Sequence, residues 1–509
     1  MGSLTIPGFA AAAAPLPHTD TQQGQGLQQR PPHVVLLASP GAGHLIPLAE
    51  LARRLVERHG FAATLVTYTD LFDPRLLQCI PASVSTVALP AFHIDVPADG
   101  PVGEMLRELV RRSLPELRSL LRSMSMPPLA AFVPDFFCAA ALPVAAEMGV
   151  PGYVFFPGSL SWIALMRHIV ELHDDVALAS AGEYRDVAEP LELPGPLSLR
   201  RADLPESCRD CSAPSYQRSM EWGRLFRDAG GLLVNIFSEM EPAALEAFEA
   251  AAKRGAFPPV FPVGPSIRSS PDKVADSKES PCLDWLDRQP TGSVVYVSFG
   301  SGGALSVEQT VELAAGLEAS GQRFLWIVRL PRLEGRHPFA FGNGHGHGHE
   351  DPLAWLPEGF LERTKGRGLA VAAWAPQVRV LSHPATAAFV SHCGWNSTLE
   401  SARSGVPVVA LPLCADQMMN ALLLEGNLGV ALRPRGGGGC VVGRDEIAAA
   451  LNEIMEGEKG SVVKRRARDL QKAATDAWSP EGSSSRALDE VVAKWMAALA
   501  PTDKIGPKI

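Results

Sequence analysis

The sequence contains no run of about 20 apolar residues, so it predicts no transmembrane helix. Its first residues also lack the basic region of a signal peptide, and Pro7, Pro15 and Pro17 interrupt their apolar part. Both absences, together with eight cysteines scattered over 509 residues, indicate a cytoplasmic protein with reduced thiols. Cys208 and Cys211 form a C-x-x-C without a second pair nearby, which favours chance spacing over a zinc site.

An excess of positive charge is lacking as well. The net charge is −9, which argues against nucleic acid or an anionic membrane as the main partner. Apolar residues make up 46% of the chain, enough for a large core. The composition therefore favours a globular protein whose main partner is neither nucleic acid nor an anionic membrane.

The dinucleotide fingerprint G-x-G-x-x-G is missing, although the fold begins in the manner of a Rossmann domain. An apolar strand at 34–38 is followed by the glycine-rich turn 39–44 and by a helix predicted over 45–59. NAD binding, and with it an oxidoreductase, thus loses its best support. The turn instead presents His44 at the carboxyl edge of a sheet, where open α/β sheets bind ligands.

Strands and helices alternate through most of the chain, which predicts two α/β domains with parallel sheets. An amphipathic helix is expected over 102–124. Residues 331–351 contain His345, His347 and His349 between glycines, and we interpret them as a surface loop because such a segment has no fixed metal geometry. The predicted boundaries are a disordered tail at 1–30, a first domain at 31–265, a polar linker at 266–280, a second domain at 281–483, a last helix at 484–499 and a tail at 500–509.

The stretch from Trp374 to Gln417 contains a phosphate-binding pattern. An apolar strand at 388–391 runs into the loop 392–396, and Ser397 with Glu400 has the spacing of a capping box that would start the next helix. Backbone N–H groups and the helix dipole favour an anion at such a helix start. His392 can donate to a phosphate, and Glu400 can accept from ribose hydroxyls.

This stretch resembles the plant secondary product glycosyltransferase box of the UDP-dependent glycosyltransferases. Further segments are similar to that family, above all to its branch acting on small phenols, such as hydroquinone glucosyltransferases: 39–47, 133–137, 264–266, 282–301 and 356–364. The resemblance covers about 33–499. It implies the GT-B arrangement of two facing Rossmann-like domains, with the acceptor mainly in the first, UDP-glucose in the second and the final helix crossing back to the first. It also implies inverting transfer without a metal or other cofactor.

The resemblance implies that His44 is the base and that Asp135 orients it. Imidazole titrates near about 6.5, which suits proton transfer at neutral pH, and an aspartate can hold its tautomer and stabilise its charge. From the residues alone, His44 could equally be a helix cap or a core histidine, and Asp135 a loop or cap residue.

For the donor, the resemblance implies that Trp374 stacks on uracil, with Ala375 and Gln377 beside the base and ribose. It implies that the diphosphate contacts His392, Asn396, Ser397 and Ser301. It implies that the ribose contacts Glu400, and that the hexose contacts Trp395, Asp416 and Gln417. Trp374 could instead be a core aromatic, and Ser397 with Glu400 a plain capping box. A glutamine at 417 goes with glucose in this family.

The acceptor is less defined by the sequence. Phe136, Phe137 and Phe156 suit a flat aromatic ring, and they suit a hydrophobic core equally well. We therefore expect a monomeric UDP-glucose-dependent glucosyltransferase acting on a phenolic, phenylpropanoid or flavonoid hydroxyl. Transfer to nitrogen, sulfur or carbon, and a non-catalytic nucleotide-sugar binding protein, remain as alternatives.

Overall fold

The structure, a computed structural model, describes residues 30–69, 71–72, 74–94, 102–125, 128–174, 189–195, 197–268, 280–332, 351–372, 374–434 and 441–500. The chain divides into the units Met1–Pro31 and Pro32–Ile509, and the described helices and strands all belong to the second unit. Four predicted segments lie mostly outside the described residues: the first tail (1–29), the linker (269–279), the Gly/His-rich segment (333–350) and the last tail (501–509).

The first half of this unit, residues 32–268, contains a parallel sheet of order β3-β2-β1-β4. Its strands are β1 (His33–Leu37), β2 (Ala62–Tyr68), β3 (Ser85–Leu89) and β4 (Leu129–Pro134). β1, β2 and β4 are apolar and almost wholly buried, as expected for a parallel sheet covered on both faces. Single parallel bridges from Phe132 to Gly152 and from Asp135 to Phe155 connect this sheet to a second parallel sheet. That sheet has the order β5-β8-β9, with β5 (Val154–Phe156), β8 (Leu232–Val234) and β9 (Val260–Pro262).

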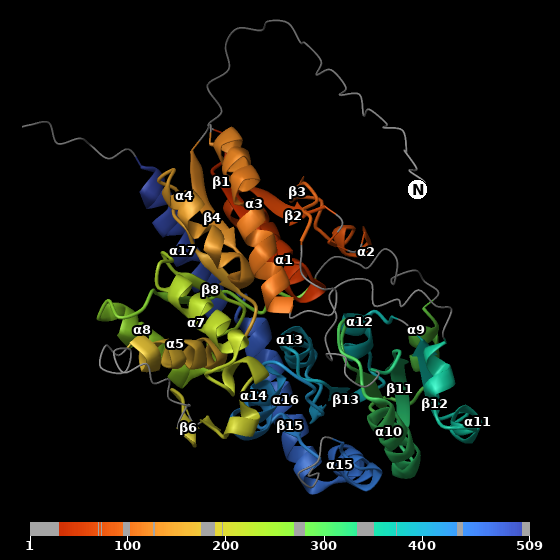
Figure 1. Ribbon diagram of the computed structural model, residues 1–509. Coiled ribbons are helices and arrows are strands. Elements are labelled where there is room, and N and C mark those ends of the chain that lie inside the picture. Colours follow the sequence, from red (N-terminus) through yellow and green to blue (C-terminus); the bar gives the residue numbers. More distant parts are fainter. Residues whose placement is uncertain are drawn as a thin grey trace, which may run out of the picture. The chain divides into compact units, whose positions relative to one another are not determined.

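The helices of the first half largely follow the predictions, and α1 and α3 lie beside the first sheet (Figure 1). α3 spans Val102–Met124, as expected. α1 (Ala42–His59) begins before the predicted position, because Gly41 already accepts hydrogen bonds from the backbone of His44 and Leu45. The other helices are α2 (Pro74–Leu77), α4 (Leu142–Ala146), α5 (Leu160–Asp174), α7 (Pro214–Phe226) and α8 (Pro242–Lys253), and β6 (Leu191–Glu192) pairs with β7 (Ser198–Leu199).

The second half, residues 280–500, has one six-stranded parallel sheet of order β12-β11-β10-β13-β14-β15. Its strands are β10 (Val294–Ser298), β11 (Arg323–Val328), β12 (Gly368–Ala372), β13 (Thr386–Ser391), β14 (Val408–Ala410) and β15 (Ala431–Leu432). Numbered within this half, that order is 3-2-1-4-5-6, the order of the doubly wound Rossmann fold. The strand order reverses between β10 and β13, so loops that follow these two strands are expected to bind the ligand.

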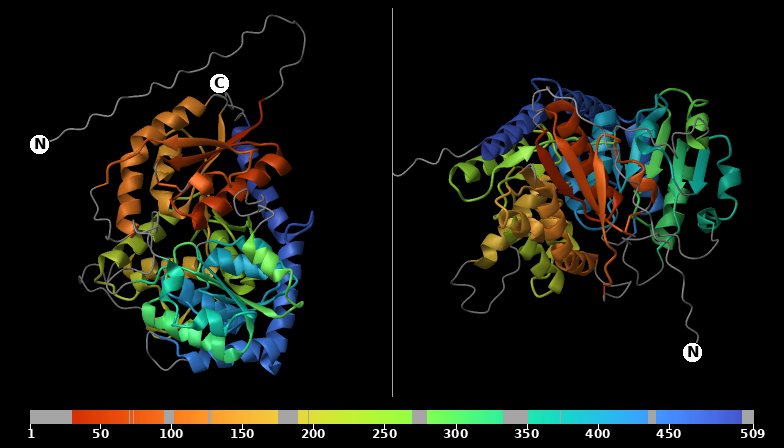
Figure 2. Two further views of the ribbon diagram at one scale, coloured as in Figure 1. Left: turned by 90° about the vertical axis from the view of Figure 1, so that its right-hand side faces the viewer. Right: turned by 90° about the horizontal axis from the view of Figure 1, so that it is seen from above.

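The helices of the second half include a last one that packs on the first half. Figure 2 shows α17 (Ser483–Leu499), in blue, beside the first sheet, and its Leu488, Val491 and Trp495 belong to the buried core of that sheet. The other α-helices of the second half are α9 (Pro281–Leu286), α10 (Val307–Ser320), α11 (Phe360–Arg363), α12 (Gln377–Leu381), α13 (Trp395–Ser404), α14 (Gln417–Leu422), α15 (Arg444–Glu456) and α16 (Glu458–Asp476).

Candidate active site

His44 and Asp135 follow two neighbouring strands of the first sheet. His44 lies in the first turn of α1, which the chain enters from β1 through Gly41, whose φ of +111° favours glycine. Asp135 directly follows β4. β1 pairs with β2 on one side and β4 on the other, so the carboxyl ends of β1 and β4 meet where the strand order reverses. The fold thus brings together two residues that are 91 positions apart.

The two side chains form a hydrogen-bonded pair. His44 Nδ1 lies 2.9 Å from Asp135 Oδ2, with Asp135 fully buried and the side chain of His44 18% exposed. Asp135 Oδ1 accepts hydrogen bonds from Ser39 Oγ and, at 3.2 Å, from the backbone N–H of Phe137. Asp135 therefore caps the short 3₁₀ helix η1 (Phe136–Ala141) and also contacts the histidine. A carboxylate at Nδ1 selects the tautomer in which Nε2 is free to accept a proton.

Aromatic rings surround this pair on the side of η1. The ring centroids of His44 and Phe137 are 5.0 Å apart, and those of Phe136 and Phe156 are 4.9 Å apart. Phe136 and Phe156 are fully buried, whereas Phe137 is partly exposed. Of the three phenylalanines predicted for the acceptor, Phe137 is thus the one that a ligand could touch in this conformation, and the other two belong to the core beneath it.

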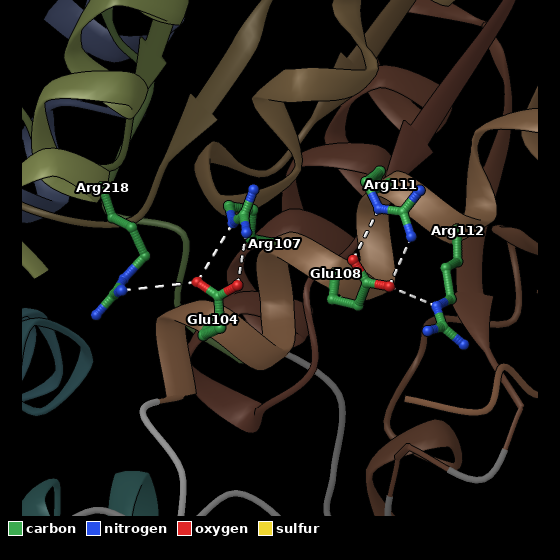
Figure 3. A network of polar contacts seen from close by, with 6 residues as sticks. All are labelled: Glu104, Arg107, Glu108, Arg111, Arg112 and Arg218. Carbon is green, nitrogen blue, oxygen red and sulfur yellow. Dashed lines mark hydrogen bonds and ion pairs between the residues drawn. The ribbon is translucent and has the colours of Figure 1, made fainter. Parts of the chain in front are cut away.

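α7 adds a ring that no sequence motif had marked. Trp222 packs edge-on against Phe137, with ring centroids 4.9 Å apart. From the same helix, Arg218 pairs with Glu104 of α3 at 3.6 Å, within a row of Glu–Arg pairs on the surface of α3 (Figure 3). These contacts connect α7 with α3 next to the aromatic cluster.

His392 follows β13, at the point where the second sheet reverses its strand order. It is 6% exposed, and burial lowers its pKa to about 4, so the ring is neutral at physiological pH. A Cβ added to Gly300 would lie 2.7 Å from the ring, and one added to Gly394 would lie 2.4 Å from it. Both glycines are needed because the imidazole occupies the space of their side chains.

Three buried polar atoms near the start of α13 have no hydrogen-bond partner within the described part of the chain, namely His392 Nδ1, Asn396 Oδ1 and Thr398 Oγ1. Buried polar groups normally have a hydrogen-bond partner, and an unsatisfied one calls for an explanation. The backbone N–H groups of the first helical turn also point to this end of α13. The expected diphosphate offers acceptors for these backbone N–H groups and for an N–H at His392 Nδ1, so these donors fit an anionic ligand here. Asn396 Oδ1 is itself an acceptor, so it would need a donor such as a ligand hydroxyl.

The start of α13 differs from the prediction. The helix begins at Trp395, with Gly394 at the N-cap position and no side-chain cap, so the prediction that Ser397 starts it as a capping box is wrong. Cys393, at φ +62°, turns the chain before the helix, which leaves Ser397 inside the first turn. Ser397 Oγ is therefore free to accept a hydrogen bond from Gln377 Nε2, at 2.9 Å.

Trp395 and Asn396 contact the first half of the chain. The indole N–H of Trp395 donates to the backbone oxygen of Asn235 at 2.8 Å, and Asn396 Nδ2 donates to the backbone oxygen of Gly43 at 3.1 Å. Gly43 immediately precedes His44, so the loop after β13 is bonded directly to the turn that carries the histidine. The ligand contacts expected of Trp395 and Asn396 stay predictions.

Gln377 connects the residues expected beside the ribose. Its Nε2 donates to Glu400 Oε2 at 2.6 Å, and its Oε1 accepts from Tyr296 at 3.2 Å. Burial raises the pKa of Glu400 to about 7, partly offset by the hydrogen bond from Gln377. Trp374 lies at the surface with 45% of its area exposed, which suits a stacking platform better than a core aromatic, while Ala375 is buried and Ser301 exposed.

The loop between β14 and α14, residues 411–416, carries Asp416. Burial raises the pKa of Asp416 to about 6, opposed by a hydrogen bond from Asn420 and by the charge of His44. Gln417 is 2% exposed, and its Oε1 accepts hydrogen bonds from the backbone N–H groups of Leu413 and Cys414. Its carbonyl oxygen is thus already used within the loop.

Sequence reasoning missed the residues that act by supporting others. Ser39 holds Asp135, Asn420 holds Asp416, and Asn235 accepts from Trp395. Ser39 is the first residue of the glycine-rich turn 39–44 and could have been suspected from that position. Nothing in the local sequence marks the other two.

Metal ligation and membrane insertion find no support within the described residues. No group of three or more His, Cys, Asp or Glu side chains there is arranged to hold a metal ion. No helix in those parts is both long and apolar enough to cross a membrane.

The chain is similar to known proteins over most of its length. The family model of UDP-glucuronosyl and UDP-glucosyl transferases matches residues 256–464. A hydroquinone glucosyltransferase from Rauvolfia serpentina is 43% identical over 479 residues, which cover 92% of this chain and 99% of that protein.

Solved structures agree in fold as well as in sequence. UGT2 of Phytolacca americana, complexed with UDP-2-fluoroglucose and pterostilbene, superposes with a TM-score of 0.79 at 39% identity, covering 91% of this chain and all of that one. A Polygonum tinctorium UDP-glucosyltransferase that glucosylates indoxyl, in complex with 3,4-dichloroaniline, reaches 0.79 at 38% identity, covering 92% of this chain and 99% of that one. The expected α/β fold with two Rossmann-like domains in the GT-B arrangement is confirmed, and the chain belongs to the plant UDP-dependent glycosyltransferases.

Proposed function

We propose that this protein is an inverting glucosyltransferase that moves glucose from UDP-glucose to a hydroxyl group of a small aromatic acceptor, with His44 as base and Asp135 as its orienting acid. The observation that carries the proposal is the 2.9 Å contact between His44 Nδ1 and the fully buried Asp135. A protein that only bound a nucleotide-sugar would not need this pair.

In the proposed reaction, His44 Nε2 takes the proton of the acceptor hydroxyl. The hydroxyl oxygen forms a bond to the anomeric carbon of glucose while the bond from that carbon to the phosphate oxygen breaks, and UDP leaves with the electron pair. A single displacement of this kind inverts the anomeric centre. Asp135 stabilises the imidazolium that forms, and proton transfer of this kind contributes about 10²–10⁴-fold to a rate.

The leaving UDP carries negative charge towards the amino end of α13. His392, Asn396, Ser397 and Ser301 are assigned to its diphosphate, where donors fixed before the reaction stabilise the developing charge. We assign no metal ion to this step. Trp374, Ala375 and Gln377 are assigned to uracil and the adjoining ribose, and Glu400 to the ribose hydroxyls. Trp395, Asp416 and Gln417 are assigned to the hexose.

The acceptor class rests on the aromatic surroundings of His44. Phe137 and Trp222 offer ring faces and edges within packing distance of each other, which suits a flat ring whose hydroxyl points to His44. Support also comes from the relatives, since one is named for hydroquinone and two were solved with pterostilbene and 3,4-dichloroaniline. The last compound offers an amine, so transfer to nitrogen belongs in the test.

The test incubates the protein with UDP-glucose and a panel that includes hydroquinone, pterostilbene and 3,4-dichloroaniline, and measures UDP release. Product mass and the anomeric coupling constant give the linkage and its configuration. We expect a β-glucoside, and a loss of at least about 10²-fold in kcat for His44→Ala. Asp287→Asn is the control, because Asp287 also pairs with a histidine, His383 at 3.1 Å, outside the proposed site.

Three outcomes would overturn the proposal. One is unchanged turnover in His44→Ala, which would show that His44 is not the base. Another is UDP-glucose binding by the wild type without UDP release from any acceptor, which would favour a nucleotide-sugar binding protein. The third is a product with the α configuration, which would contradict the single displacement.

A further inference from the structure

The β14–α14 loop, residues 411–416, is held by side chains rather than by regular structure. The backbone N–H groups of Leu413 and Cys414 donate to Gln417 Oε1, at 2.8 and 3.1 Å. Ala415 then adopts a left-handed conformation, with φ at +55°, which is uncommon for a residue other than glycine. Asp416 follows directly and is bonded by Asn420. The orientation of Asp416 therefore depends on how the peptide before Ala415 is fixed.

That peptide is fixed by a residue of the first half. The backbone N–H of Ala415 donates to Glu206 Oε2 at 2.9 Å, although 209 positions separate the two residues. Glu206 begins the 3₁₀ helix η3 (Glu206–Cys208). Arg209, 3.9 Å from Glu206, donates in turn to the backbone oxygens of Leu204 and Ala202. The acceptor oxygen is thus presented from a braced segment.

We propose that Glu206 is a positioning residue that holds the β14–α14 loop so that Asp416 faces the hexose of the donor. This inference rests on the proposed function, because it assigns the hexose to Asp416. It gives the first half of the chain a part in recognising the sugar, besides its part in binding the acceptor.

The β14–α14 loop carries a residue assigned to the hexose and none assigned to the nucleotide. Trp374, His392 and Glu400, the residues assigned to UDP, lie outside that loop. Loosening the loop should therefore weaken contacts to the hexose and leave those to UDP in place. A general disturbance of the fold would weaken both.

Two substitutions test this, Glu206→Ala and Glu206→Gln. Alanine removes the acceptor, whereas glutamine keeps an amide oxygen for the N–H of Ala415. For Glu206→Ala we expect the KM for UDP-glucose to rise about threefold to tenfold, in line with the loss of one hydrogen bond. Calorimetry should show the Kd of UDP-glucose rising to the same extent and the Kd of UDP changing less than about twofold. Glu206→Gln should restore most of the affinity, and Glu246→Ala, at an exposed position of α8, should match the wild type.

Three results would overturn the inference. These are an unchanged affinity for UDP-glucose in Glu206→Ala, an equal loss for UDP and UDP-glucose, and a loss in Glu206→Gln as large as in Glu206→Ala. The calorimetric comparison needs no turnover, so it tests Glu206 even if the wild type transfers no sugar. Absence of transfer would count against the proposed reaction alone.

Discussion

At the scale of single residues, the two oxygens of Asp135 have different partners. Oδ1 is occupied by Ser39 and the backbone of Phe137, which leaves Oδ2 for His44. A fully buried carboxylate with these hydrogen bonds cannot rotate without breaking them. The histidine is therefore oriented by a group that is itself fixed.

Asp135→Asn tests this orientation. The amide has nearly the same shape, but it carries no charge to stabilise an imidazolium, so kcat should fall by about 10²–10⁴-fold while the KM for UDP-glucose changes little. Steady-state kinetics with varied donor measure both. Asp287→Asn, in the exposed pair with His383, should leave both constants unchanged. Equal effects of the two substitutions would contradict the role of Asp135.

His392→Asn should change how stability depends on pH. The pKa of His392 is about 4 in the folded protein, against about 6.5 in an unfolded chain. Between these values the unfolded chain binds more protons at this position, so His392 lowers the free energy of unfolding as the pH falls. From pH of about 6.5 to about 5, the wild type should lose up to about 2 kcal/mol relative to the variant.

Urea unfolding at both pH values, with unchanged m values, measures this difference. Asp416 and Glu400 carry raised pKa values and act in the opposite direction in both proteins, so the comparison cancels their effect. A difference between the two proteins that does not vary with pH would contradict a buried, neutral His392.

At the scale of elements, the strands and long helices follow from periodicity, whereas the start of α13 does not. The spacing of Ser397 and Glu400 matches a capping box, yet both side chains bond with Gln377 of α12. The local sequence favours a helix cap, but the side-chain oxygens of Ser397 and Glu400 instead accept hydrogen bonds from Gln377. A single sequence does not contain that information, because Gln377 reaches Ser397 only after β13 and α12 have packed.

The turns before and after β10 offer a matched pair of substitutions. Gly300 and Gly292 have similar left-handed conformations, at φ +74° and +64°, but a Cβ at Gly300 would meet His392, whereas one at Gly292 would meet nothing within 4 Å. Alanine at either position should cost about 1–2 kcal/mol of backbone strain. Only Gly300→Ala should also weaken UDP binding, by about tenfold or more, since it displaces His392. Similar UDP affinities of the two variants in calorimetry would argue against the placement of His392.

At the scale of the whole molecule, the sequence predicted two βα series and the return of the last helix, but it could not predict which atoms join the halves. The βα series are visible because each buried strand leaves a continuous apolar run. The bonds from Trp395 to Asn235 and from Asn396 to Gly43 involve backbone oxygens, which every residue has. Their pairing follows from the fold alone. The bond from the backbone N–H of Ala415 to Glu206 also depends on the fold alone, since nearly every residue has such an N–H group.

Trp495→Ala tests how far α17 stabilises the first half. Trp495 is fully buried and packs edge-on against Tyr153 and Phe61, with ring centroids 5.5 and 6.0 Å apart. Removing its side chain should lower the free energy of unfolding by about 3–5 kcal/mol. Chemical denaturation measures this loss. Met496→Ala, on the exposed side of the same helix, should cost less than about 0.5 kcal/mol, and equal costs would contradict the packing.

The way in which Gln417 is bonded has a consequence for how donor preference can change during evolution. Its Oε1 serves two backbone N–H groups, and a histidine in its place offers a single acceptor nitrogen. At least one amide would lose its partner, at about 1–3 kcal/mol. Under the proposed function, in which Gln417 contacts the hexose, sugar preference and the fold of the preceding loop would therefore change together. A lineage that replaces this residue would then need a compensating change in the loop before a new preference could persist.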